Sequence, residues 1–129
     1  MTDMRIRPER ADYELIVGEM VAVEQPSLVG DDLGKEVAET IADSAGALEA
    51  IIDEIWAARQ QTTDAPGQIT DEAFGAALRA AVEKLRAEGD EFPTGEELDA
   101  NIAEALQDES AKALAQAAWK RAGEKLSQA

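Results

Sequence analysis

Residues 70–89 read TDEAFGAALRAAVEKLRAEG, and this stretch decides the fold class. Thr70 is a favourable N-cap residue, and the two acidic residues that follow it suit the positive end of the helix dipole. Apolar residues recur every three or four positions, as on the buried face of a helix: Phe74, Leu78, Ala81, Val82 and Leu85. Gly89 is typical of a helix C-terminus, and Pro93 prevents continuation. The stretch therefore predicts an amphipathic α-helix.

The next segment continues the helical pattern. Thr94 and Glu97 have the spacing of a capping box, which marks the start of a helix. Apolar residues then follow on one drifting face: Leu98, Ile102, Leu106, Leu114 and Trp119. No Pro or Gly interrupts the pattern before Gly123, which favours one long C-terminal helix over residues 95–127, straight or kinked, of about 40 Å. The alternative is two helices, with Ser110 as the N-cap residue of the second.

Two helices are predicted upstream. Over residues 32–60, apolar positions follow a near-heptad spacing, which predicts one helix that suits pairing with another copy, although Gly46 inside it costs about 1 kcal/mol relative to Ala. Residues 8–24 carry a helical stripe, but several Val and Leu residues share one parity, so a strand is the alternative. We expect an all-α fold, a small bundle of four or five helices forming one domain over 1–129, with a division into two lobes near 61–68 as the alternative.

Composition limits the chemistry. The chain has 129 residues, enough for one hydrophobic core, and 45% of them are hydrophobic, so its acidity has not replaced the core-forming residues. There is no Cys and no His. Disulfides, thiolate metal sites and Cys nucleophiles are thereby excluded, and the commonest general base is missing. A non-enzymatic function is expected.

The net charge favours one class of partner. The chain carries 12 Lys and Arg against 28 Asp and Glu, a net charge of −16. Nucleic acid and anionic membranes would repel it, so we expect a basic protein partner. The alternative is that the acidity only maintains solubility. No signal-peptide pattern and no apolar run of membrane-spanning length occurs, which predicts a cytoplasmic location.

Motifs for cofactors and metals are weak. Residues 30–35 resemble a phosphate loop only in their glycines and lysine, because Glu36 follows where the motif has Ser or Thr. Glu36, Glu39 and Asp43 share one face of the predicted helix and form a carboxylate set of the kind that binds Mg²⁺. A solvated helix face explains the same spacing better. No cofactor and no metal are predicted.

The acids gather in one segment. Residues 88–109 hold nine acidic and no basic residues, whereas residues 110–129 hold four basic residues and one acidic residue. Optimisation of the helix dipole explains this order without any binding. If the segment binds a basic partner, the contact residues are those around its turn: Glu88, Asp90, Glu91, Glu96, Glu97 and Asp99.

Three functions follow, in descending order. The first is an acidic binding protein that occupies a basic surface on a protein, as inhibitors, immunity proteins, antitoxins and nucleic-acid mimics do. The second is a structural or assembly protein of a virion or scaffold, forming a homo-oligomer through its long helices. The third is a metal-dependent hydrolase built from carboxylates alone. Trp56 and Trp119 are expected in the core; exposed, either would instead anchor a partner.

Overall fold

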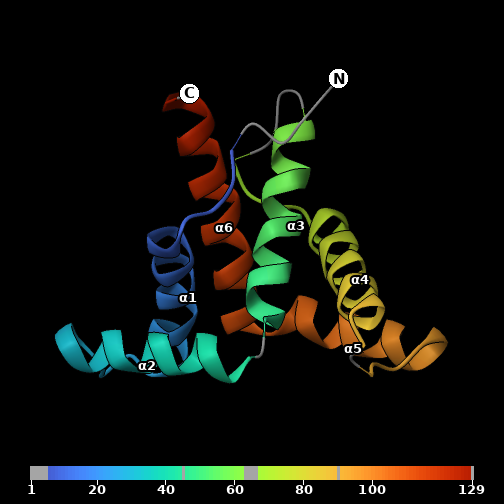
Figure 1. Cartoon of the computed structure of the whole chain (residues 1–129), viewed down its shortest axis with the longest axis horizontal. Coiled ribbons are helices and arrows are strands. Elements are labelled where there is room, and N and C mark those ends of the chain that lie inside the picture. The colour runs from blue at the N-terminus through green and yellow to red at the C-terminus, as the bar shows by residue number, and fades with distance from the viewer. Residues whose placement is uncertain (1–5, 45, 63–66, 90, 129) are drawn as a thin grey trace.

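A computed structural model describes residues 6–44, 46–62, 67–89 and 91–128 of the chain (Figure 1). In these ranges the chain forms helices and no strands: α1 (Arg10–Glu24), α2 (Gly30–Asp43), α3 (Ala47–Gln61), α4 (Asp71–Ala87), α5 (Gly95–Gln107) and α6 (Glu109–Gln128). The all-α prediction is confirmed, and the segment predicted at 8–24 is a helix over Arg10–Glu24 and not a strand. The count is six in the described residues, rather than the four or five expected, because both long helices of the prediction are divided.

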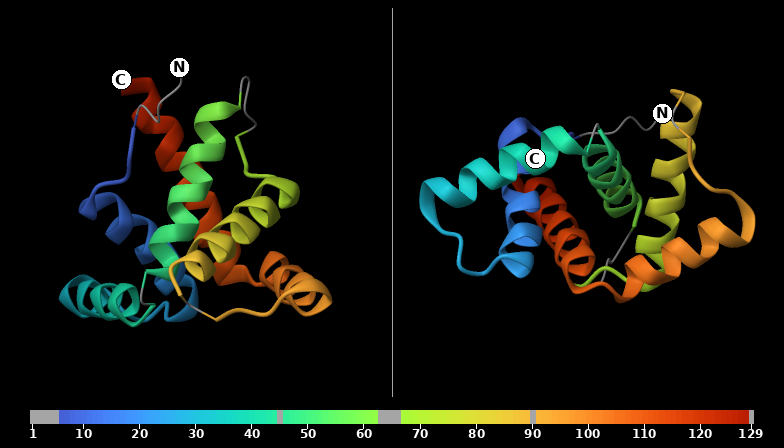
Figure 2. Two further views of the ribbon diagram at one scale, coloured as in Figure 1. Left: turned by 45° about the vertical axis from the view of Figure 1, so that its right-hand side comes forward. Right: turned by 90° about the horizontal axis from the view of Figure 1, so that it is seen from below.

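The helices form two flanks around a central pair. α3 and α6 pack against each other in the middle, with α1 and α2 on one side and α4 and α5 on the other (Figures 1 and 2). α1 packs on both α6 and α2, whereas α4 packs on α3, and α5 on α4 and α6. None of the helices in the described ranges combines the length and the apolarity that a membrane span requires.

The core lies where these helices meet. Its fully buried large side chains include Ile16 and Val17 of α1 and Ile52 and Trp56 of α3. Trp119 of α6 is 3% exposed, so both tryptophans pack in the core as predicted, and neither is an exposed anchor. The main cluster draws residues from both sides of the 61–68 connection, while the division into lobes there stays a prediction.

The predicted helix over 32–60 is wrong, because the chain turns between α2 and α3. Gly46 has a φ of +91°, a left-handed conformation that only glycine adopts without strain. Before it, the Ser44 hydroxyl donates to the Ile41 carbonyl at 2.8 Å and so adds a second hydrogen bond to an acceptor in the last turn of α2. The turn sends α2 across α1 and α3 along α6 (Figure 1), which one straight helix cannot do.

The predicted long C-terminal helix is also divided. Asp108 has an extended backbone, with φ −81° and ψ 124°, between α5 and α6. One of its carboxylate oxygens accepts from the Ser110 hydroxyl at 2.7 Å and from the N–H groups of Ser110 and Ala111 at 2.9 and 3.3 Å. These hydrogen bonds, that of the Ser110 hydroxyl first, hold the pKa of Asp108 below its usual value. Asp108, and not Ser110, is therefore the N-cap residue of α6, which remains the longest helix.

Candidate protein-binding surface

The acidic residues that the sequence singles out lie where α4 leads into α5. Glu88 is the C-cap residue of α4, Glu91 lies in the connection, Glu96 and Glu97 are in the first turn of α5, and Asp99 follows on the same helix. All five are exposed. We call these five residues the acidic corner; the sixth predicted residue, Asp90, lies outside the described residues.

Two glycines and an arginine shape the acidic corner. Gly89 has a φ of +108° and Gly95 a φ of +59°, so each allows a change of direction that other residues resist. Arg86 bridges the connection, because its Nη2 donates to the Pro93 carbonyl at 2.7 Å. The turn between α4 and α5 is therefore tied to the last helical turn of α4.

The predicted capping box is not formed. Thr94 is the N-cap residue of α5, but its side chain makes no hydrogen bond to the first turn. The left-handed backbone of Gly95 brings the chain into the helix along a path different from that of an ordinary first helical residue. Glu97 consequently has no capping role, and its charge is available to solvent or to a partner.

One acid of the corner is paired. Arg79 of α4 donates from Nη2 to Oδ1 of Asp99 at 2.7 Å, with the two side chains 48% and 61% exposed. The sequence reasoning overlooked both arginines at this surface. Arg79 and Arg86 are seven positions apart, two turns of one helix face, and this spacing could have indicated that α4 directs positive charge toward α5.

A shallow groove of about 530 Å³ lies within the corner. Its walls include Glu91, Phe92 and Arg86. Phe92 is half-buried and packs against a small cluster of Ala50, Ala81 and Leu85 that joins α3 to α4. Nε of Arg86 is buried without a hydrogen-bond partner. The groove thus combines an apolar ring with one charge of each sign, an arrangement that suits contact with a long cationic side chain.

No metal centre is formed by the described residues. No three acidic side chains among them are close enough to hold one ion. In the carboxylate set suggested by the sequence, Oε2 of Glu36 lies 3.4 Å from the hydroxyl oxygen of Thr40. The exposed acids of the corner can attract and pair with cationic groups.

A second feature, unforeseen in the sequence, joins the first helix to the last. Asp12 of α1 is 1% exposed, and its Oδ1 accepts from Arg121 Nε at 2.8 Å, with Lys125 Nζ at 3.9 Å. Burial raises the pKa of Asp12, but the Glu9 N–H group, Arg121 and Lys125 outweigh it and lower the pKa overall. The sequence alone does not distinguish Asp12 from the other acidic residues among the 28, because its basic partners lie near the other end of the chain.

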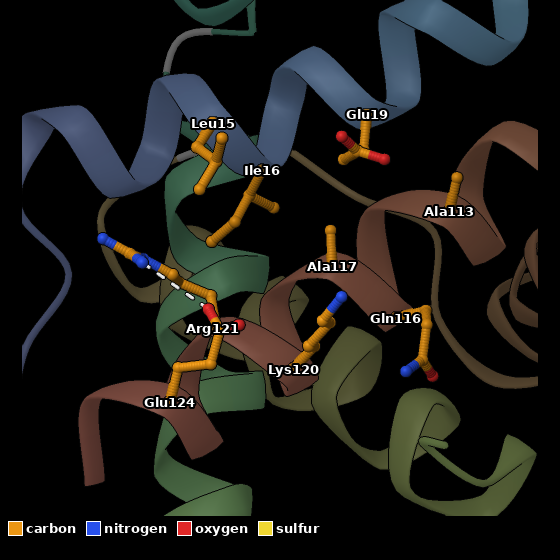
Figure 3. Close-up of a pocket in the computed structure, with 9 residues that line it drawn as sticks. All are labelled: Leu15, Ile16, Glu19, Ala113, Gln116, Ala117, Lys120, Arg121 and Glu124. Carbon is orange, nitrogen blue, oxygen red and sulfur yellow. Dashed lines mark ion pairs between the residues drawn. The ribbon is translucent and has the colours of Figure 1, made fainter. Parts of the chain in front are cut away.

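Beside this ion pair, a groove of about 440 Å³ runs between α1 and α6 (Figure 3). Leu15 of α1 and Ala117 of α6 contribute apolar surface above the fully buried Ile16, while Glu19 and Lys120 stand on opposite walls.

Comparison of the chain with protein-family models, with curated proteins and with solved structures gives no match.

Proposed function

We propose that the chain is a non-enzymatic binding protein whose acidic corner occupies a basic surface on a protein partner. The observation that carries the proposal is the exposure of five acidic side chains, of which only Asp99 pairs with a basic residue among those described. Lys and Arg side chains of a partner can pair with the other four without first breaking an internal ion pair.

The distribution of charge supports a specific orientation. α5 holds four acidic residues and no basic one, whereas α6 holds four basic residues against two acidic ones. Because the net charge is −16, the field attracts a basic protein from a distance, and the difference between these two helices favours docking on the α5 side over the α6 side. This is how inhibitors, immunity proteins and nucleic-acid mimics engage cationic sites.

The alternatives have less support. The assembly alternative relied on two long helices, and both are divided, at Gly46 and at Asp108. The hydrolase alternative needs a carboxylate metal site, and the described residues form none.

The test is recovery of the partner and measurement of its binding. The tagged chain is exposed to cell extract at low salt, the retained proteins are purified, and their complexes with the chain are measured by light scattering and calorimetry. We expect a basic protein in fixed stoichiometry whose affinity falls steeply from about 0.1 M to about 1 M salt, as the Debye length shortens from about 10 Å to about 3 Å. A partner whose affinity is insensitive to salt would contradict the proposal.

A further inference from the structure

We infer that the groove between α1 and α6 is the contact surface of a two-fold dimer of this chain, in which the α1–α6 pair of one copy packs against the α1–α6 pair of the other. The inference does not rest on the acidic corner, which lies on the opposite flank (Figure 1).

The first argument is exposed apolar surface. Leu15 is 52% exposed, although it occupies the middle of α1 and lines this groove. It also lines a second groove, of about 640 Å³, between α1 and α2. Leu15 therefore stands on a ridge between two grooves. A side chain in this position can pack into a groove on a facing surface, as ridges do between packed helices.

The second argument is charge. Glu19 lies on the α1 wall and Lys120 on the α6 wall, and neither makes an ion pair with another residue that the structure describes. In a two-fold interface, residue i of one copy meets residue j of the other, and j meets i. Glu19 of each copy can then pair with Lys120 of the other, so the groove is complementary to itself.

The third argument is local neutrality. The groove has two acidic and two basic residues on its walls, Glu19 and Glu124 against Lys120 and Arg121. The net charge of −16 makes two copies repel each other overall, and this repulsion is weaker where the local charges balance. A second copy therefore suits this neutral groove better than it suits the acidic corner.

The helix geometry is compatible with such a pair. α1 and α6 run antiparallel, since Asp12 meets Arg121 and Glu19 lies near Ala113 (Figure 3). Two such pairs facing each other make a four-helix bundle. The 15 residues of α1 give a shared face about 22 Å long and about 20 Å wide, which is smaller than a standard specific interface and in the range of weak ones, so we expect a dissociation constant no tighter than micromolar.

The test is sedimentation equilibrium of the full chain at about 0.15 M salt, where the Debye length is about 8 Å. The native chain should change from 13.8 kDa to twice that mass as its concentration rises. Leu15→Glu should raise the dimer dissociation constant at least about tenfold, since each interface gains two buried charges. Val29→Glu, which also replaces an aliphatic residue with Glu but at a position that is 72% exposed and does not line the groove, should leave the dissociation constant within about twofold.

Charge exchange tests the pairing itself. Glu19→Lys and Lys120→Glu should each weaken the dimer about tenfold, and the double variant, which keeps the net charge at −16, should recover most of the native affinity. A chain that stays at 13.8 kDa up to about 1 mM overturns the inference. The inference is also overturned if the dimer survives Leu15→Glu, if the double variant binds no more tightly than the single variants, or if another protein occupies the groove.

Discussion

Asp12 and Arg121 are 109 positions apart in the chain, yet Arg121 Nε lies 2.8 Å from Asp12 Oδ1. The contact joins α1 to α6 at a point where Asp12 is 1% exposed and the Arg121 side chain is 27% exposed. The carboxylate also accepts the Glu9 N–H at 2.9 Å, which caps the start of α1. The first and last helices are thus joined by one buried charge in addition to the apolar core that they share.

Removal of this charge should be costly. Asp12→Ala removes the buried partner of Arg121, which keeps Glu124, and leaves the Glu9 N–H without its acceptor, so we expect the free energy of unfolding to fall by about 2 kcal/mol through the lost charged hydrogen bond and the lost cap. Glu14→Ala, which removes the exposed pair with Arg10, is the control and should change it by less than about 0.5 kcal/mol. Urea unfolding measures both, and equal losses would contradict a special role for Asp12.

The same pair predicts a pH dependence. The folded-state pKa of Asp12 is lowered from 3.8, so its contribution is fully present above that value and is lost as the pH falls through the folded pKa. The difference in unfolding free energy between the native chain and Asp12→Asn should therefore be constant above about pH 5 and shrink below the unfolded value. Because the other acidic residues are present in both chains, their contributions to the pH dependence cancel in this difference. A gap unchanged down to the lowest pH at which both chains fold would refute the lowered pKa.

Two glycines inside helices should respond differently to alanine. A Cβ on Gly75 of α4 would lie 3.7 Å from Ile102, in ordinary contact, so Gly75→Ala should stabilise the fold by about 0.5–1 kcal/mol. A Cβ on Gly123 of α6 would lie 3.1 Å from Arg59 Nη2, whose guanidinium lies 5.7 Å from the Trp119 ring centroid. Displacing that cation–π contact should cancel most of the gain in Gly123→Ala. Thermal unfolding measures the stability of both variants. Equal stabilisation by Gly75→Ala and Gly123→Ala would contradict the described position of Arg59.

Gly46 tests the turn between α2 and α3. Gly46→Ala places a side chain on a residue with φ +91°, which should cost about 1–2 kcal/mol because L-residues resist this conformation. Gly34, where a Cβ would meet no atom within 4 Å and φ is not positive, is the matched position. Gly34→Ala should instead be neutral or stabilising in the same urea titration. Stabilisation by both would indicate one continuous helix, as the spacing of apolar residues alone suggests.

Local patterns predicted the helices but not their ends. The segment 70–89 contains the residues that mark both ends of its helix, Thr70 and Gly89, and α4 begins and ends within two residues of the prediction. At Gly46 and Asp108 the apolar spacing continues across the break, because both helices bury the same kind of face. The breaks depend on the dihedral angles of one residue and on where the next helix packs, and neither is encoded in periodicity.

The acidic corner was predictable in the same partial way. Its residues are close in sequence, so they had to be close in space, and their exposure follows from their charge. What sequence could not supply was the pairing of Asp99 with Arg79 or the absence of a side-chain cap at Thr94, since both depend on how α5 packs on α4.

The most direct measurement compares two double charge reversals in their affinity for the purified partner. Glu96 and Glu97 follow a glycine with φ +59° at the start of α5, and Asp31 and Asp32 follow one with φ +60° at the start of α2, on the other flank. All four are exposed, so both reversals to Lys perturb the helix dipole alike, and each changes the net charge from −16 to −12.

Calorimetry should show that Glu96→Lys with Glu97→Lys weakens binding at least about a hundredfold, because close charge pairs are lost and repulsion replaces them. Asp31→Lys with Asp32→Lys should weaken it only a few fold, through the reduced long-range field. Circular dichroism checks that both variants remain folded. Equal losses from the two folded variants would mean that the partner responds to net charge alone and that the acidic corner is not its binding site.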